Sequence, residues 1–500
     1  MATATISQVG ERDTAVAPQE DVESRREQKD SPLYAGRINV YPRAVHGPVR
    51  RIKWAVLIVL LAVYYLTPWI RWDRGAGAPD QAVLIDMPSR RAYFFWIEIW
   101  PQEVYYLTGL LILGALGLFL VTTLFGRVWC GYTCPQTVWT DLFMWIERLI
   151  QGDRNERVKL DRQPWTGVKV AKKGATHAAW LLIAVATGGA WIMYFNDAPT
   201  IVHDLFTGQA GGGSYFFVGL FTATTYVLGG LAREQVCTYM CPWPRFQAAL
   251  TDEDSLVVTY QGWRGEPRGK HKKGESWAGR GDCIDCKACV AVCPTGIDIR
   301  DGYQLECIGC GLCVDACNDI MPKVDRPPNL ITFDSQYNQV ACAAGVAPRH
   351  RFLRPRALVY AGLIAVVGGV MLIGLSTRAT TEISIQRDRN PLFVTLSDGA
   401  IRNGYTFKLL NMRREPRSYE LTVADRPQAS LRIVGGEIGG TEEGTGALPL
   451  EAKPDGVSTY RVYVTLPRAV IDGEHLPVTF ELSAPDGATT RHEQVFRAPA

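Results

Sequence analysis

Five stretches of the chain are long and apolar enough to cross a lipid bilayer, and this feature constrains the fold most. A membrane-spanning helix needs about 20 mostly apolar residues. The five stretches are residues 54–70, 104–125, 175–195, 215–232 and 357–375. The sequence therefore predicts an α-helical membrane protein with five spans. The fourth stretch contains several Thr and Gly residues, so a buried helix of a soluble domain is the alternative there.

The distribution of Lys and Arg predicts the orientation of the chain in the membrane. Basic residues concentrate before the first span, between the second and third spans, and before the fifth, whereas the loop between the third and fourth spans has none. Loops rich in Lys and Arg stay on the cytoplasmic side. The first outer loop carries four Arg residues, which weakens the rule there. We expect the N-terminus inside, the C-terminus outside, and an outer aromatic belt of Trp69, Trp72, Trp96 and Trp100.

Composition then divides the chain into regions. Residues 1–50 are polar and charged and contain no signal peptide, which predicts a partly disordered cytoplasmic tail. Short alternating runs such as FVTLSDG and STYRVYVTL, separated by turn residues, predict an immunoglobulin-like β-sandwich at the C-terminal end. The predicted regions after the tail are 51–250 with four spans, 251–345 as a cytoplasmic cysteine-rich domain with linkers, 346–378 with the fifth span, and 379–500 as the periplasmic β-sandwich.

The thirteen cysteines all fall before residue 343, on the predicted cytoplasmic side. Thiols stay reduced there, which favours metal ligands or redox groups over disulfides. Eight of them form C-x2-C-x2-C-x3-C twice, in CIDCKACVAVCP and CIGCGLCVDACN. This pattern is typical of bacterial ferredoxins with two [4Fe–4S] clusters, in which the fourth Cys of each run reaches the other cluster. The predicted ligands are Cys283, Cys286, Cys289 and Cys317 for one cluster, and Cys307, Cys310, Cys313 and Cys293 for the other.

Neighbouring residues fit an inserted two-cluster ferredoxin domain. Gly309, Gly311 and Ala288 are expected to keep side chains out of the space that a cluster fills. Pro294 follows the first run, and Asn318 stands at the equivalent position after the second. A pair of zinc knuckles is the alternative, but zinc sites use two cysteine pairs with a long gap between them.

A second cysteine pattern follows the second and fourth spans, in RVWCGYTCPQ and REQVCTYMCPWP. Residues four apart share a helix face, so each copy would present two sulfurs together at the membrane surface. The two pairs could form one four-thiolate site or two two-thiolate sites. Soft thiolates favour Cu(I), zinc or iron–sulfur clusters, and Cu(I) suits two thiolates. The predicted copper site is Cys130, Cys134, Cys237 and Cys241, with Met240 and Met144 as nearby thioethers.

Simple packing of buried thiols at helix ends is the alternative for this second pattern. The sequence also lacks C-x-x-C-H, nucleotide-binding glycine loops and flavin or nicotinamide fingerprints. Attached c-type haem is thereby excluded, and nothing indicates a nucleic-acid partner.

Taken together, these features resemble the FixG/CcoG family of accessory proteins for assembly of cbb(3)-type cytochrome c oxidase. The resemblance runs from Tyr34 onward and includes the leader YAGRINVYPRAVHG and the stretch RDRNPLFVTLSDGAIRNGYT. It implies a cytoplasmic Cu(II) reductase that supplies Cu(I) to the oxidase, with an unidentified electron donor. A copper exporter or chaperone and oxidase assembly factors would be its partners. The family's thiol motifs map onto all twelve cysteines named above, without saying which bind copper.

Two other functions stay open at this point. Membrane polyferredoxins of nitrate-reduction systems also join C-x3-C-P pairs to ferredoxin domains, so a quinol dehydrogenase is one alternative. An assembly scaffold whose clusters sense redox state is the other. The oligomeric state is not specified by the sequence, and a homo-oligomer is left open.

Overall fold

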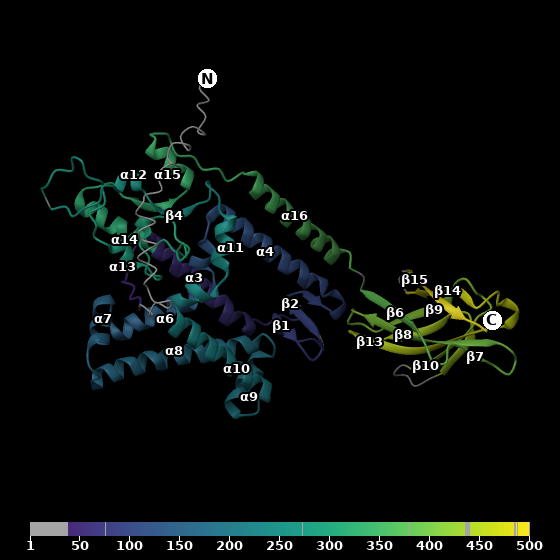
Figure 1. Ribbon diagram of the computed structural model, residues 1–500. Helices are drawn as coiled ribbons and strands as arrows, with labels where there is room; N and C mark the ends of the chain where they lie inside the picture. Colours follow the sequence, from purple (N-terminus) through teal and green to yellow (C-terminus); the bar gives the residue numbers. More distant parts are fainter. Residues whose placement is uncertain are drawn as a thin grey trace, which may run out of the picture. The chain divides into compact units, whose positions relative to one another are not determined.

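A computed structural model describes residues 39–499 of the chain, apart from residues 76, 273, 379, 436–440, 485, 486 and 488. The chain divides into two compact units, Met1–Gly369 and Val370–Ala500. Figure 1 shows that the first unit is mainly helical and that the second is built from strands. Most of the predicted N-terminal tail, residues 1–38, lies outside the described residues.

Within the described residues, five helices are long and apolar enough to cross a membrane, as predicted. They are α3 (Pro48–Leu66) with η2 (Thr67–Trp69), η3 (Pro101–Glu103) with α4 (Tyr105–Phe125), α8 (Gly167–Met193), α10 (Gly212–Thr225) with the π-helical η4 (Tyr226–Ala232), and α16 (Pro355–Ser376). Their outward side chains are apolar, for example Leu111 and Leu182, which are 66% and 72% exposed. Large exposed apolar surfaces mark contact with lipid or another protein. The first unit is therefore that of a membrane protein.

Helix α8 begins at Gly167, well before the predicted start at residue 175. The hydroxyl of Thr166 caps its first turn by accepting from the backbone N–H of Lys169. The ammonium of Lys169 donates to the carbonyl oxygens of Asp161 (2.9 Å) and Gln163 (2.6 Å). Hydropathy detects only the apolar part of such a helix, so the basic turns at its start were missed.

The region between α3 and α4 contains a small antiparallel sheet that the sequence reading did not predict. Its strands are β1 (Val83–Asp86), β2 (Arg91–Phe94) and β3 (Ile97–Ile99), in that order. Trp69, Trp72 and Trp96 are exposed, as an interfacial belt requires. Trp100 is instead buried, and the guanidinium of Arg91 lies 3.6 Å from its ring centroid.

Short helices at one end of the bundle carry the second cysteine pattern and connect the spans. They are α5 (Val128–Tyr132), α6 (Pro135–Gln151), α7 (Arg154–Arg162), the π-helical η5 (Val236–Met240) and α11 (Trp243–Leu250). At the other connection, α9 (Ala198–Thr207) joins α8 to α10. Proline begins α6 and precedes α11 because it lacks the N–H that a first helical turn would leave unbonded.

The inserted cysteine-rich domain is closed by a two-stranded antiparallel sheet. Strand β4 (Val257–Tyr260) pairs with β5 (Ile331–Asp334), so Val257 lies opposite Asp334. The helical elements between and after these strands are α12 (Gly262–Gly265), α13 (Ala288–Val292), η6 (Ile299–Asp301), α14 (Leu312–Ile320), η7 (Met321–Val324) and α15 (Gln336–Ala343). The ligand loops therefore emerge from one small core that includes Val258, Ile331 and Val314.

An extended segment of residues 39–47 ties this domain to the helical bundle. The Arg43 N–H donates to the carbonyl of Ala291 in α13 (2.8 Å), and the Ala44 N–H donates to Asp153 next to α7 (2.9 Å). The segment then enters α3, where the N–H groups of Val49 and Arg50 donate to the carboxylate of Asp315 in α14 (3.2 and 2.7 Å). The first span is thus anchored directly to a helix that carries cluster-motif cysteines.

The second unit is an immunoglobulin-like β-sandwich, as predicted. Within the described residues, one sheet has the order β11-β10-β13-β8-β6, with β7 beside β8, and the other has the order β12-β9-β14-β15. The strands are β6 (Thr381–Arg387), β7 (Val394–Thr395), β8 (Ile401–Asn411), β9 (Arg417–Val423), β10 (Ser430–Gly435), β11 (Thr441–Thr445), β12 (Leu448–Ala452), β13 (Gly456–Leu466), β14 (His475–Ser483) and β15 (Thr489–Arg497). Burial alternates along β13, which places every second residue in the core. Tyr405, Phe407 and Phe480 pack edge to face at its centre.

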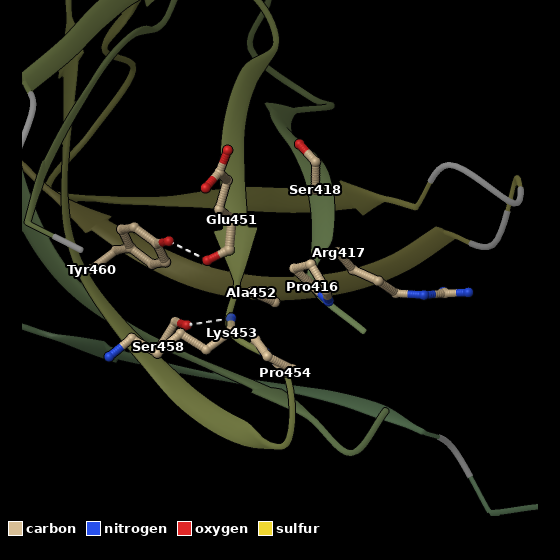
Figure 2. A pocket seen from close by; sticks show the side chains of 9 residues that line it. All are labelled: Pro416, Arg417, Ser418, Glu451, Ala452, Lys453, Pro454, Ser458 and Tyr460. Carbon is tan, nitrogen blue, oxygen red and sulfur yellow. Dashed lines mark hydrogen bonds between the residues drawn. The ribbon is translucent and has the colours of Figure 1, made fainter. Parts of the chain in front are cut away.

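A cavity at the edge of this sandwich is lined by residues at the start of β9, the end of β12 and the first half of β13 (Figure 2). The Tyr460 hydroxyl donates to the carbonyl of Glu451, and the hydroxyl of Ser458 accepts from the N–H of Lys453 (3.0 Å). The side chains in view are those of an ordinary polar surface, without a cysteine.

Candidate functional site

The first predicted cluster site gathers four cysteines from two parts of the cysteine-rich domain. Cys283 and Cys289 are buried and Cys286 is exposed. Cys317 is near the end of α14. Each of the other three thiols opposes its ionisation, which shows that all three lie close to it. Burial is the main factor that raises the pKa of Cys317, to about 12. The structure thus places the distant fourth cysteine beside the three that are close together in the sequence.

The second predicted cluster site has the reciprocal arrangement. Cys313 in α14 interacts with Cys310, Cys307 and Cys293, and the same Cys293 also opposes ionisation of Cys307 and Cys310. Burial raises the pKa of Cys307 to about 12. All four thiols, together with Cys289, line one small cavity.

This donor set fits [4Fe–4S] clusters. Buried thiols with raised pKa values stay protonated unless a bound cationic group stabilises the thiolates. Among the described residues, no three His, Cys, Asp or Glu side chains are close enough to hold a single metal ion. A cubane cluster spreads its ligands over four irons, so more widely spaced thiols suit it.

The glycines of the second run also meet a backbone requirement that was not predicted. Gly309 and Gly311 both have a positive φ, +67° and +69°, which favours glycine. A Cβ on Gly311 would lie 2.7 Å from the Phe333 ring, and one on Gly309 would lie 3.1 Å from the Arg127 carbonyl carbon. These glycines therefore allow close approach of protein segments, in addition to any room they leave for a cluster.

The C-x3-C-P pairs lie at breaks between helices, which corrects the expectation that each pair shares one helix face. Cys130 is in α5, but Cys134 is extended (φ −60°, ψ 127°) and caps the start of α6. In the second copy Cys237 is in η5 and Cys241 is extended just after it (φ −80°, ψ 122°). The proline after the second cysteine disfavours a helical conformation for the residue before it, so the helix stops there.

The two copies nevertheless bring their four thiols into one neighbourhood. Ionisation of Cys130 is opposed by Cys134, Cys237 and Cys241. Burial raises the pKa of Cys130 to about 12 and that of Cys237 to about 11, while the charge of Arg127 works in the opposite direction at both. We refer to Cys130, Cys134, Cys237 and Cys241 as the thiol quartet.

The thiol quartet packs directly against the loop that carries Cys307 and Cys310. A Cβ on Gly131 would lie 2.9 Å from the Cα of Cys310, so the two backbones touch. The Tyr132 hydroxyl donates to the carbonyl of Cys310 (3.2 Å). Cys130 and Cys237 also pack against the apolar cluster that contains Cys310.

Two residues that the sequence reading did not assign hold this contact together. Arg127 is 3% exposed and donates to the carbonyls of Leu305 and Cys307, the latter at 2.6 Å. Its Nε donates to Oε1 of Gln247 (3.2 Å), and the same oxygen accepts from the Cys130 thiol (3.1 Å). The Arg repeated in both motif copies was the available signal for Arg127, whereas nothing in the sequence marked Gln247.

The two methionines predicted near the copper site differ in exposure. Met240 is 63% exposed, and Met144 is buried in α6. Neither is among the side chains that pack in the apolar cluster next to Cys130 and Cys237.

Comparison with protein families agrees with this architecture. A model described as a 4Fe-4S dicluster domain matches residues 232–336, and one described as an IG-like fold at the C-terminal of FixG matches residues 371–499. A 4Fe-4S binding domain model matches residues 107–152, which include Cys130 and Cys134. The fold, the arrangement of the cysteines and these family matches place the protein in the class of membrane-bound iron–sulfur electron-transfer proteins.

Whole-chain relatives then identify the family. Nitrogen fixation protein FixG of Rhizobium meliloti is 52% identical over 465 residues, which cover 87% of this chain and 88% of that protein. Protein RdxA of Cereibacter sphaeroides is 48% identical over 87% of this chain and 91% of its own length. Protein RdxB of the same organism is 46% identical over 93% of this chain and 97% of its own length. The chain belongs to the FixG family.

Proposed function

We propose that this protein reduces Cu(II) to Cu(I), with copper bound as substrate by two thiols of the thiol quartet, because no three of the described thiols are close enough to share one ion. The observation that carries the proposal is the direct contact between Gly131 and the backbone of Cys310, which joins the thiol quartet to a cluster-ligand loop. Bound [4Fe–4S] clusters supply one-electron transfer, which is the chemistry that this reduction needs. One electron from an external reductant is consumed for each Cu(II) converted.

The chain's own residues account for binding and for the preference for product. Thiolates are soft ligands and bind Cu(I) in preference to harder ions. The Cys130 and Cys237 thiols have raised pKa values, so copper binding releases protons from them. Gln247 Oε1 links the Cys130 thiol to Arg127, which binds the Cys307 loop, and the charge of Arg127 partly offsets the negative charge of the thiolates.

We further propose that this site faces the cytoplasm of a bacterial inner membrane, with the β-sandwich on the periplasmic side. The support is the set of basic residues at the helix ends beside the cysteine-rich domain, including Arg50, Lys169 and Arg354, because such residues favour the cytoplasmic side. Cu(I) would then pass to a copper exporter or chaperone for assembly of a cbb(3)-type oxidase.

The test uses the full-length protein purified without oxygen and reduced with dithionite. Cu(II) is added with a Cu(I)-specific chelator, and cluster absorbance and chelated Cu(I) are followed together. We expect cluster oxidation and Cu(I) formation to match in amount. Changing all four quartet cysteines to Ala should slow both, while Cys342→Ala, a half-buried cysteine in α15 outside every site, should not.

Two other results would contradict the proposal. Clusters that ignore Cu(II) but are reduced by a quinol would indicate a quinol dehydrogenase. The four-cysteine variant could lose iron while the Cys342→Ala control keeps both its iron and its rate of Cu(II) reduction. That result would show that the thiol quartet holds a cluster instead of copper. The iron content of each variant is therefore measured beside its rate.

A further inference from the structure

A cavity of about 750 Å³ lies where α3 begins, between that helix and α6. Its wall combines basic side chains, among them Arg50, Arg51 and Arg148, with the rings of Trp54 and Trp145. The two rings meet edge to face at 5.8 Å. The cavity is separate from the thiol quartet and from both cluster sites, and the proposed copper chemistry does not use it.

The basic groups in this cavity have hydrogen-bonding capacity to spare. Arg50 is 5% exposed, and its Nη1 donates to both carboxylate oxygens of Asp141 (2.9 and 2.8 Å). Its Nη2 is buried without a partner, as is Nε of Arg148. In the described part of the chain, Arg50 Nη2 is the one terminal guanidinium nitrogen left in that condition. An unpaired charged donor in a buried position is costly, so a ligand that accepts from it would be stabilising.

The charge balance points to an anion. Asp141 is the carboxylate bound to Arg50, and it is shared with Lys53, whose ammonium lies 3.6 Å away. Burial and the nearby charge of Arg50 lower the pKa of Arg148, whereas Asp141 and Asp153 act in the opposite direction. Arg51 adds a further exposed cation at the rim.

The apolar side of the cavity points to an amphiphile. Trp145 and Leu149, one turn apart on α6, are 42% and 71% exposed beside the start of a membrane-spanning helix. Trp residues favour the level of the lipid headgroups, because the ring is mostly apolar but its N–H can bond to water or headgroups there. Basic pockets between helices at the membrane surface bind the headgroups of anionic lipids.

We propose that this cavity binds the phosphate headgroup of an anionic phospholipid, with Arg50 and Arg148 donating to the phosphate and the lipid tail lying over Trp145 and Leu149. The site has a structural consequence. The backbone N–H groups of Val49 and Arg50 bind Asp315 in α14, so a lipid held at Arg50 also fixes the cysteine-rich domain against the membrane.

The test measures lipid retention by native mass spectrometry of the full-length, cluster-loaded protein in detergent with added phosphatidylglycerol. The variant is R51Q/R148Q, which spares the Arg50–Asp141 pair. The matched control is R351Q/R356Q, which removes two exposed basic residues, one before α16 and one in its first turn, that do not line the cavity. We expect wild type and control to retain one tightly bound phosphatidylglycerol and the cavity variant to bind it on the order of thirty-fold more weakly.

Iron content and the cluster absorbance spectrum establish that each variant is folded. Phosphatidylcholine, which has no net charge, should be retained poorly by all three proteins. The single variant Arg148→Lys, which keeps Arg51 and the charge at position 148, should bind phosphatidylglycerol nearly as well as wild type. Equal retention of phosphatidylglycerol by wild type and R51Q/R148Q would overturn the proposal. Displacement of the lipid by millimolar inorganic phosphate would also overturn it, because it would assign the site to free phosphate.

Discussion

Replacing Arg127 tests whether the contact between the thiol quartet and the Cys307 loop matters for electron transfer. In Arg127→Met the carbonyls of Leu305 and Cys307 and the amide oxygen of Gln247 lose a buried charged donor. Hydrogen bonds to charged groups contribute about 1.5–3 kcal/mol each, so the contact should loosen measurably. Arg127→Lys keeps the charge but cannot reproduce this forked geometry.

The electrostatic effect can be estimated from the same geometry. Arg127 acts against the raised pKa of Cys307, which shows that its charge reaches that sulfur. If the separation is taken as roughly 7 Å and the effective dielectric constant as about 20, one charge contributes about 2 kcal/mol. For a one-electron couple this equals about 90 mV. Removing a positive charge disfavours electron addition, so the reduction potential of the nearer cluster should fall by about that amount.

The assay is a redox titration of the full-length protein followed by electron paramagnetic resonance. We expect Arg127→Met to lower one of two potentials, and Arg127→Lys to leave it near the wild-type value. Arg300 offers a matched control because its charge instead acts on Cys289, in the other predicted cluster site. Arg300→Met should therefore shift the other potential. If both Met variants shift the same centre, or Arg127→Met shifts neither, the assignment of Arg127 to the Cys307 site is refuted.

Three further substitutions test the packing around the site and the second unit. Gly311→Ala should destabilise the protein by about 2–4 kcal/mol, because strain at positive φ adds to a clash with Phe333. Gly302→Ala is the control, since it has the same kind of strain with open space around it. Equal denaturant midpoints for the two variants would contradict this prediction. Asp141→Asn leaves buried Arg50 and Lys53 without their counter-ion and should cost about 3–5 kcal/mol, seen as a lower thermal midpoint in detergent; an unchanged midpoint would argue against a buried ion pair. Phe407→Ala, at the centre of the β-sandwich, should cost about 3–5 kcal/mol, while Val457→Ala, 46% exposed, should be close to neutral in the same denaturation experiment.

The parts of the site that the sequence predicted are those encoded by local patterns. The spans follow from runs of apolar residues, and the two cysteine runs follow from short spacings that a cluster imposes. The pairing of Cys317 with the first run could also be predicted, because in the repeated pattern the fourth cysteine of each run reaches the other cluster. In the structure α14 places Cys317 near the first-run thiols. Strand alternation in the β-sandwich was equally visible, since each strand buries every second residue.

Long-range contacts were the parts that the sequence could not predict. The segment 39–47 reads as a polar tail, but it bonds to Ala291 and Asp153, residues more than a hundred positions away. The sheet β1–β3 consists of strands of three or four residues, too short for a periodic signal. The burial of Trp100 depends on Arg91 lying over its ring, which no composition rule specifies.

The helix-face argument for the cysteine pairs failed for a local reason that was present in the sequence. Proline restricts the residue before it to extended conformations, so Cys134 and Cys241 could not continue the helix of their partners. The same restriction produces the break from which the second thiol of each pair projects. The pairs converge even though the assumed geometry was wrong, because both copies carry the same break.

The repeated Arg shows why two copies of one motif are not interchangeable. Arg127 of the first copy bonds to the Cys307 loop, whereas Arg233 of the second pairs with Glu147 on α6 (2.9 Å). The second copy is held further by Gln136, next to the first copy's proline, whose amide donates to the carbonyl of Leu228 (2.8 Å). One copy is therefore fastened to the cysteine-rich domain and the other is fastened to the first. This chain of anchors assembles four thiols from two spans beside a single cluster loop, which neither copy could do alone.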